Sequence, residues 1–297
     1  MFRFKDKLIL MASLGAVLGV AHAVYATDVE FALESETETD QPATLHSGAE
    51  LEVYYGEHVT LNFKTPLAVS GVPGEVPVTS PLFQACNFVE TITDTKVMYT
   101  RGEGTSAIAT MVFGKHTHSI TGIRGSFAIA LEKGRPMITW QFKGLFNAPT
   151  ATGQAMLQPN WTNWKKPEVL GPENGSLFKL NNVDLKLHKL SVDVGNTLVY
   201  DRVITHAAIE IPAHKSKANV TVTATELAAF NPFELQGEVV NLQFGHGTAA
   251  GKKFSIQGRM QMPVPKYANL STELTGWELE GNLIPLNGND ELTVSFE

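Results

Sequence analysis

The chain has 297 residues and a net charge of −7; 43% of its residues are hydrophobic and 18% are charged. This composition is typical of a globular protein and excludes a disordered or low-complexity chain. The negative charge and the absence of a basic cluster exclude the electrostatic footprint of a nucleic-acid-binding protein. Cys86 is the single cysteine, which excludes an internal disulfide and a cysteine-based zinc site. We expect it to be a small buried hydrophobic side chain.

The first 26 residues have two interpretations. Residues 1–7 are basic, residues 8–21 are largely apolar, and Ala21-His22-Ala23 places small residues at the spacing of a signal-cleavage site. This pattern matches a secretory signal peptide, and the stretch is too short and too interrupted by glycine for a membrane span. The alternative is an apolar N-terminal arm, in which Leu8–Leu18 is a strand that packs within a larger assembly.

Most of the remaining chain is predicted to be β-strand. Polar and apolar residues alternate in several runs, with glycine or Asn-Gly punctuation between them. Strict alternation predicts strands with one buried and one solvated face. The clearest runs are His58–Phe63, Thr139–Phe142, Lys217–Val222 and Leu292–Phe296.

Two short helices are predicted. Ser80–Cys86 begins with an N-cap serine followed by Pro81 at the first helical position. Asn231–Leu235 begins in the same way, with an N-cap asparagine and Pro232, and Gly237 ends it quickly. Each helix would flank one half of the chain.

The two halves of the chain resemble each other. Five features of the first half recur in the same order in the second, which indicates an internal duplication. The matches are Val59–Leu61 with Val220–Val222, Ser80-Pro81 with Asn231-Pro232, Phe113-Gly114 with Phe244-Gly245, Ser119–Gly122 with Ser255–Gly258, and Trp140–Gly144 with Trp277–Gly281. A weaker sixth match relates Val29–Leu33 to Val183–Leu187.

This repeat divides the chain into two tandem units of β-sandwich or β-barrel type, 27–148 and 177–297. Between them, residues 149–176 form a connector with several prolines and two tryptophans, Trp161 and Trp164. Its composition predicts an ordered segment that lays aromatic rings on a surface, unlike a flexible Gly/Ser linker. The segments Thr39–Tyr55 and Asn147–Gly175 are candidates for contacts between subunits, because they are long and contain apolar residues.

The sequence holds no convincing catalytic, cofactor or metal site. His116 and His118 share one strand face and could bind a metal, but no third ligand lies nearby, which favours a polar strand face. Gly245–Gly251 looks faintly like a phosphate loop, yet a strand and not a helix follows it, so we expect a hairpin turn. We therefore expect a protein that is not an enzyme and has no cofactor.

Six runs of the chain resemble, in order, the major tail (tail tube) proteins of long-tailed bacteriophages of the siphophage type. Together they extend from about residue 57 to the C-terminus. The runs are Ser80–Phe88, His118–Ser126, Phe142–Pro149, Leu190–Asn196, Phe244–Gly251 and Asn289–Val294.

The resemblance implies a structural virion protein. In such tubes, sheets of neighbouring units join edge to edge into a closed barrel, and stacked rings form the tube through which DNA is delivered. Tail rings are commonly sixfold, so two units in one chain imply a ring of three chains with pseudo-sixfold symmetry. The acidic chain also predicts a lumen that conducts DNA without binding it specifically.

The resemblance also implies the partners and the location. The partners would be further copies of the chain and the tail terminator, tape measure and distal tail proteins, with no membrane. Assembly would take place in the host cytoplasm and the product would be the virion tail. The alternative is an exported bacterial β-sandwich protein of the surface or adhesin type, secreted or periplasmic after its signal peptide is cleaved.

Overall fold

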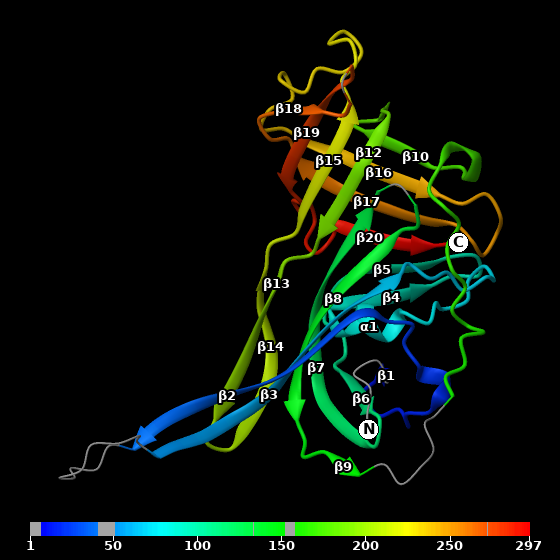
Figure 1. Cartoon of the computed structure of the whole chain (residues 1–297). Coiled ribbons are helices and arrows are strands. Elements are labelled where there is room, and N and C mark those ends of the chain that lie inside the picture. The colour runs from blue at the N-terminus through cyan, green and yellow to red at the C-terminus, as the bar shows by residue number, and fades with distance from the viewer. Residues whose placement is uncertain (1–6, 41–50, 133, 152–157, 272) are drawn as a thin grey trace.

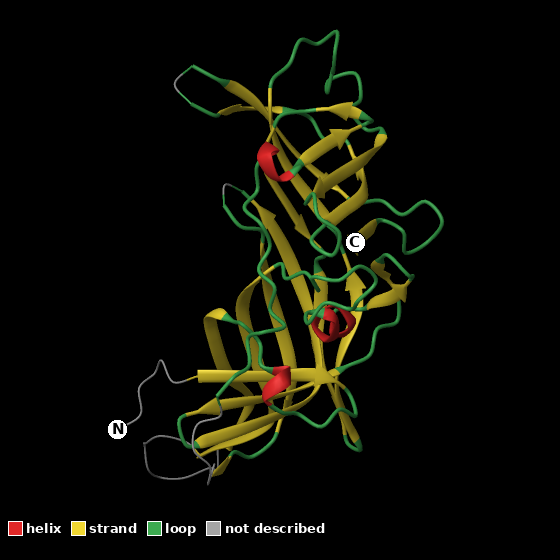
Figure 2. Cartoon of the chain, turned by 90° about the vertical axis from the view of Figure 1, so that its right-hand side faces the viewer, coloured by secondary structure: helices red, strands yellow, loops and turns green. Residues whose placement is uncertain are grey.

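The computed structural model describes residues 7–40, 51–132, 134–151, 158–271 and 273–297. These residues form a mainly β protein with an 11-stranded sheet, a 7-stranded sheet and a two-stranded sheet. The predicted mainly β class is therefore confirmed (Figure 1). In the side view of Figure 2, strands run along most of the elongated molecule and only short helical turns interrupt them.

The larger sheet draws strands from both halves of the chain. Its strands, in spatial order, are β18 (Lys266–Asn269), β19 (Thr275–Asn282), β15 (Lys217–Thr223), β12 (Leu187–Asp193), β7 (His116–Leu131), β8 (Met137–Phe146), β3 (Leu51–Pro66) and β2 (Thr27–Asp40). Off this path, β6 (Ala107–Phe113) pairs with β7 and with β1 (Lys7–Ser13), and β9 (Thr150–Ala151) pairs with β7.

The 7-stranded sheet also crosses between the halves. Its order is β11 (Val183–Asp184), β10 (Leu177–Leu180), β16 (Val239–His246), β17 (Phe254–Gln261), β20 (Leu292–Phe296), β5 (Val97–Arg101) and β4 (Phe88–Ile92). The two-stranded sheet is a long hairpin of β13 (Asn196–Val203) and β14 (His206–His214). Because β7 pairs with β12 and β5 pairs with β20, the two proposed units share both large sheets.

All four runs that alternate in sequence lie in strands. His58–Phe63 falls in β3, Thr139–Phe142 in β8, Lys217–Val222 in β15, and Leu292–Phe296 is β20. In β15 the alternation matches the burial of alternate residues, as expected for strands with one face on the core. The polar members of the runs in β3, β8 and β15 lie on the opposite face of the larger sheet.

Aromatic side chains fill the core of the first half around the short helix α1 (Ser80–Ala85). Phe83 of α1 is fully buried and lies 4.7 Å from Tyr99 and 5.1 Å from both Phe127 and Trp140, measured between ring centroids. Burying a phenylalanine stabilises the fold by roughly 1.5–3 kcal/mol. Cys86, which ends the helix, is buried as predicted. The buried side chains of α1 therefore form part of the hydrophobic core.

The first predicted helix is confirmed and the second is wrong. The structure begins α1 at Ser80 with Thr79 as the N-cap, one residue before the predicted cap. The segment after Asn231 forms turns instead of a helix. The side chain of Asn231 accepts a hydrogen bond from the backbone N–H of Phe233, and Gly237 has a φ of 87°. Too few residues remain between them to offset the cost of helix nucleation.

The apolar N-terminal stretch contains a core strand. β1 pairs antiparallel with β6, and its five central residues are buried. Ile9 and Met11 join the main core, whereas Leu8 and Leu10 pack with Val112 in a small second cluster. Both faces of β1 are therefore covered. Among the residues that the structure describes, no helix has the length and apolar character needed to cross a membrane.

In the described part of the connector, both tryptophans contact the N-terminal segment. Trp164 is buried, and its indole N–H donates a hydrogen bond to the carbonyl oxygen of Ala23 over 2.8 Å. Trp161 lies edge-on to Tyr25 with ring centroids 5.3 Å apart. The connector thus packs on the segment that follows β1, although residues 152–157 lie outside the described ranges.

Candidate functional site

The histidine pair behaves as part of a strand. His118 is half-buried against Phe31 and Phe113, with ring centroids 5.2 Å and 5.7 Å away. Burial lowers the pKa of His118, and the nearby His116 lowers it further. Within the described ranges, no group of three or more His, Cys, Asp or Glu side chains is placed to hold a metal ion. The ring contacts of His118 favour a role in packing the strand face over a role in binding a metal.

The glycine-rich run after β16 is a hairpin turn, as predicted. β16 and β17 pair antiparallel up to His246 opposite Phe254. Gly247 and Gly251 have φ values of 100° and 77°, which L-residues rarely adopt. A Cβ at Gly251 would also lie 2.4 Å from the carbonyl carbon of Gly71. Glycine is needed here for backbone geometry and close packing.

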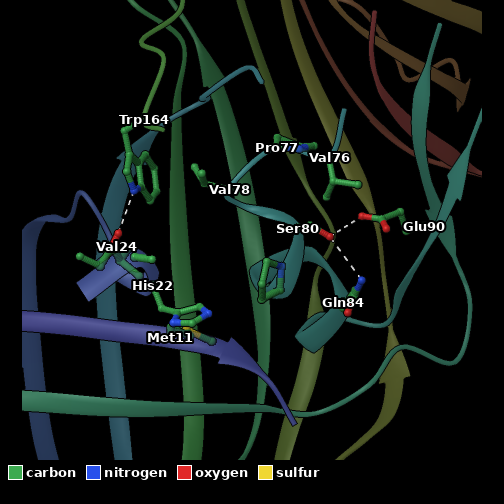
Figure 3. A pocket seen from close by; sticks show the side chains of 13 residues that line it. Met11, His22, Val24, Val76, Pro77, Val78, Ser80, Gln84, Glu90 and Trp164 are labelled. Carbon is green, nitrogen blue, oxygen red and sulfur yellow. Dashed lines mark hydrogen bonds between the residues drawn. The ribbon is translucent and has the colours of Figure 1, made fainter. Parts of the chain in front are cut away.

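A cavity of about 340 Å³ lies between the N-terminal segment, α1 and the connector (Figure 3). The hydroxyl of Ser80 donates to Oε2 of Glu90, Tyr99 donates to the same oxygen over 2.7 Å, and the amide of Gln84 donates to Ser80 over 3.3 Å. These polar atoms are thus occupied by one another. The lining is Met11, Ala21, His22, Ala23, Val24, Val76, Pro77, Val78, Ser80, Pro81, Gln84, Glu90 and Trp164.

A buried polar cluster joins the two halves. Arg101 Nε donates to Oε1 of Glu291 over 2.7 Å, and its other nitrogens donate to Asn196 Oδ1 and to Val194 O. Burial lowers the pKa of Arg101, and Glu291 opposes that shift. Asn196 in turn donates to the carbonyl oxygens of Cys86 and Gly125 at the base of β13. The cluster fixes the point where the β13–β14 hairpin leaves the body.

Two hairpins project from the same side of the molecule (Figure 1). We call the outer part of β2–β3, Glu36–Asp40 with Leu51–Tyr55, the first arm, and β13–β14 the second arm. The first arm covers the described part of the predicted contact segment Thr39–Tyr55; residues 41–50 lie outside the described ranges. Large apolar side chains are exposed on both arms: Leu51, Val53 and Tyr54 on the first, and Val199, Val203 and Ile204 on the second.

The second arm packs on the sheet face of the first half. Tyr200 stacks on His58 with ring centroids 4.7 Å apart and an interplanar angle of 14°. Arg202 lies over the ring of Tyr55 at 5.1 Å, and Ile209 is buried at 3% exposure. The arm therefore crosses from the second half to cover the base of the first arm.

The strand ladders of the two halves match rung by rung. Strands β8, β3 and β2 follow one another as β19, β15 and β12 do, and both outer strands carry an irregularity, between Thr27 and Glu30 and between Leu187 and Lys189. The matching rungs are Trp140–Phe63 with Trp277–Val222, Phe142–Leu61–Phe31 with Leu279–Val220–Leu190, and Gly144–Val59–Leu33 with Gly281–Ala218–Val192.

These rungs shift two of the sequence matches. Val59 corresponds to Ala218 and not to Val220, and Phe31 corresponds to Leu190 and not to Leu185. The Val59 match slips by two residues, which sequence alone does not detect, because side chains alternate with a period of two and the same face stays buried. The Phe31 match slips by five residues, from Leu185 to Leu190.

Two strands at the ends of the larger sheet have a paired neighbour on one side only, within the described part of the chain: β2 beside β3, and β18 beside β19. β2 carries Glu30, Glu34, Glu36 and Glu38, whereas β18 carries Lys266. Such edges expose unpaired N–H and C=O groups and can pair with another chain. They are the candidate assembly site, together with the arms.

The sequence singled out Thr39–Tyr55 as a candidate contact loop, but it did not indicate the two hairpin arms, the two edges or the Arg101 cluster. Strand order is set by contacts between segments that are far apart in the chain, so no local sequence pattern predicts these features. Comparison with protein-family models found none that matches the chain. The search of curated proteins likewise found no significant match.

Proposed function

We propose that this chain is a structural subunit that assembles edge to edge into closed rings, which stack into the tail tube of a long-tailed bacteriophage. The resemblance of its six sequence runs to major tail proteins supports the identity of the tube. The geometry of the sheets supports the mode of assembly. In this proposal the protein is not an enzyme.

The observation that carries the proposal is a joint within the chain. β12 of the second half pairs with β7 of the first, with Leu190 opposite Leu131 and Val192 opposite Ile129. This joint connects the set β18-β19-β15-β12 to the matching set β7-β8-β3-β2. In these two sets, β2 is equivalent to β12, and β18 is equivalent to β7 because each lies beside its own equivalent neighbour, β19 or β8. The same joint between chains would pair β2 of one copy with β18 of the next.

The charges on these edges favour that heterologous pairing. Two β2 edges would bring Glu30 and Glu34 of both chains together, and like charges across strands are destabilising. Pairing β2 with β18 in the register of the β12–β7 joint would instead place Glu36 opposite Lys266. A head-to-tail contact of this kind generates a ring when its rotation closes.

The duplication sets the proposed stoichiometry. If the intrachain joint and the interchain joint share one rotation, each chain supplies two of six positions. Three chains then complete a pseudo-sixfold ring, which matches the sixfold rings of the family that the sequence resembles. Every edge in the plane of the ring would be paired, and growth would continue only by stacking.

DNA would pass through the lumen without specific binding. The polar face of the larger sheet carries both signs of charge, and several carboxylates there are paired with lysines, as in Asp28–Lys64 at 2.9 Å and Glu132–Lys189 at 2.6 Å. Such a face would offer few free cations to phosphates. The acidic lumen and the terminator, tape measure and distal tail partners stay predictions of the same proposal.

The alternative, an exported surface protein with a cleaved leader, fits the fold less well. Cleavage after Ala23 would remove β1, uncover the edge of β6 and leave Val112 without its cluster partners Leu8 and Leu10. It would also take away the carbonyl oxygen that accepts the hydrogen bond of Trp164. β1 is buried on both faces, so its removal by cleavage would expose apolar surface that the fold otherwise covers.

Electron microscopy of the purified full chain tests the proposal. We expect hollow rings or tubes in which one ring contains three chains. Rings of six whole chains would overturn the stoichiometry. Dispersed monomers at all concentrations would overturn the assembly itself.

A further inference from the structure

We infer that the first arm clasps the neighbouring chain of the ring, lying over β15 and β19 of that second copy near its Lys217. This inference rests on the proposed function, since it requires the β2–β18 joint. Its partner is a second copy of this chain. The basis is a contact that the chain already makes between its own halves.

The second arm supplies the template. It leaves the body between β12 and β15 and contacts β7 and β8 of the adjoining half. Its Tyr200 stacks on His58 of the next strand, β3. The second arm thus extends from the second half, across the β12–β7 joint, onto the face of the first half. The first arm extends from β2 and β3, which are equivalent to β12 and β15. It would therefore extend across the β2–β18 joint onto the second half of the next chain.

The receiving face in the second half is uncovered within one chain. His58 and Lys217 occupy equivalent positions in the sheet. Val59 corresponds to Ala218, and His58 and Lys217 are the residues that directly precede them. The side chain of His58 is 10% exposed beneath Tyr200, whereas that of Lys217 is 47% exposed. The same position is thus covered in one half and open in the other.

The first arm has a matching unburied residue. Leu51 lies about as far from His58 along the chain as Ile209 lies from Lys217, so the two occupy similar places on their arms. Ile209 is 3% exposed because its arm is docked, but Leu51 is 68% exposed. Burying one leucine is worth roughly 1.5–3 kcal/mol, which gives the first arm a reason to dock.

The charges on the two surfaces contribute little to this placement. The first arm carries Glu36, Glu38 and Asp40 opposite Tyr55, Val53 and Leu51. The receiving face begins with Lys215 and Lys217, both exposed. Lys217 is already paired with Glu280 of β19 at 3.4 Å, so the charge on this face is partly neutralised and the burial of Leu51 supplies the main drive for docking.

The test uses mixtures of two singly substituted chains. Leu51→Cys chains are mixed with Lys217→Cys chains, assembled, and treated with a short bismaleimide; the native Cys86 stays in place because it is buried. The matched control replaces Lys217→Cys by Lys252→Cys, because Lys252 has a similar exposure of 54% but lies on the β16–β17 turn. Microscopy of each mixture reports assembly separately.

We expect cross-linked dimers of the two different chains, several-fold more abundant than in the Lys252→Cys mixture. If rings form but cross-linking does not exceed the control, the clasp is wrong and the proposed function stands. If neither rings nor cross-links form, the proposed function fails and the clasp fails with it.

Discussion

Arg101 donates a hydrogen bond from Nε to Oε1 of Glu291 over 2.7 Å, and both side chains are almost fully buried. The pair joins β5 of the first half to the segment just before β20 of the second. It therefore holds together the two halves whose joint we use as the template for assembly. Around it, Ser216 and Val194 also accept hydrogen bonds from Arg101.

Removing one partner of this pair should be costly. We expect Arg101→Met to lower the free energy of unfolding by about 3–5 kcal/mol, because it leaves a buried carboxylate without compensation. The double variant Arg101→Met/Glu291→Met should be less destabilised than the single one. Urea unfolding of the two variants measures the difference.

The partly exposed ion pair Lys96–Glu297, at 2.8 Å, provides the control. Lys96→Met should cost less than about 1 kcal/mol, as surface ion pairs do. An effect of Arg101→Met no larger than that of Lys96→Met would show that the buried pair does not hold the halves together.

The N-terminal strand should be needed for stability. We expect Ile9→Ala and Met11→Ala each to cost about 2–5 kcal/mol, because each leaves a cavity in the main core. Leu14→Ala, one residue beyond β1 and exposed, should change the unfolding free energy very little. Urea midpoints decide between the outcomes. Near-wild-type stability of a chain that lacks residues 1–26 would support the cleaved-leader alternative.

Proline in β18 should block assembly without unfolding the chain. In an antiparallel strand, neighbouring residues point their N–H groups alternately toward the partner and away from it. Proline at either Tyr267 or Ala268 therefore removes an N–H that faces away from β19. We expect one of these two variants to keep the wild-type circular dichroism spectrum but to sediment as a monomer.

Val264→Pro is the control, since Val264 already lies between two prolines in an exposed loop. It should assemble as the wild type does. If both β18 variants fold and form normal rings, the β2–β18 joint is not the assembly contact.

Glu34 should add stability that is lost in acid. The Thr60 hydroxyl donates to Oε1 of Glu34 over 2.5 Å and is the main reason that the pKa of this carboxyl is lowered, with Lys143 and His58 contributing. A lowered folded-state pKa means that the contribution is fully present above the unfolded-state pKa. It is lost as the pH falls through the folded-state value.

We therefore expect Glu34→Gln to be less stable than the wild type at pH 7, by less than about 1 kcal/mol because the group is partly solvated. The difference should disappear toward pH 3. Urea unfolding across that range measures it, with Glu57→Gln on β3 as the control for removing an exposed carboxylate. A constant difference between Glu34→Gln and the wild type across the range would contradict this account.

Local patterns in the sequence were sufficient for the strands and for one helix. The alternation in Lys217–Val222 reports directly which side chains face the core, so β15 follows from its own residues. Pro81 and its neighbours specify α1 for a similar reason. The Asn231 segment misled because it has the same start signal, and its side-chain hydrogen bond to Phe233 favours a turn.

By itself, the sequence determined that this protein is mainly β and that its N-terminal stretch is apolar. These properties follow from short stretches of sequence, through the alternation of polar and apolar residues, the turn residues and the composition. Only the tertiary structure decided that β7 pairs with β12, that Tyr200 covers His58, and that Arg101 meets Glu291. Such contacts join residues far apart in the chain, and their pairing depends on the packing of the whole sandwich.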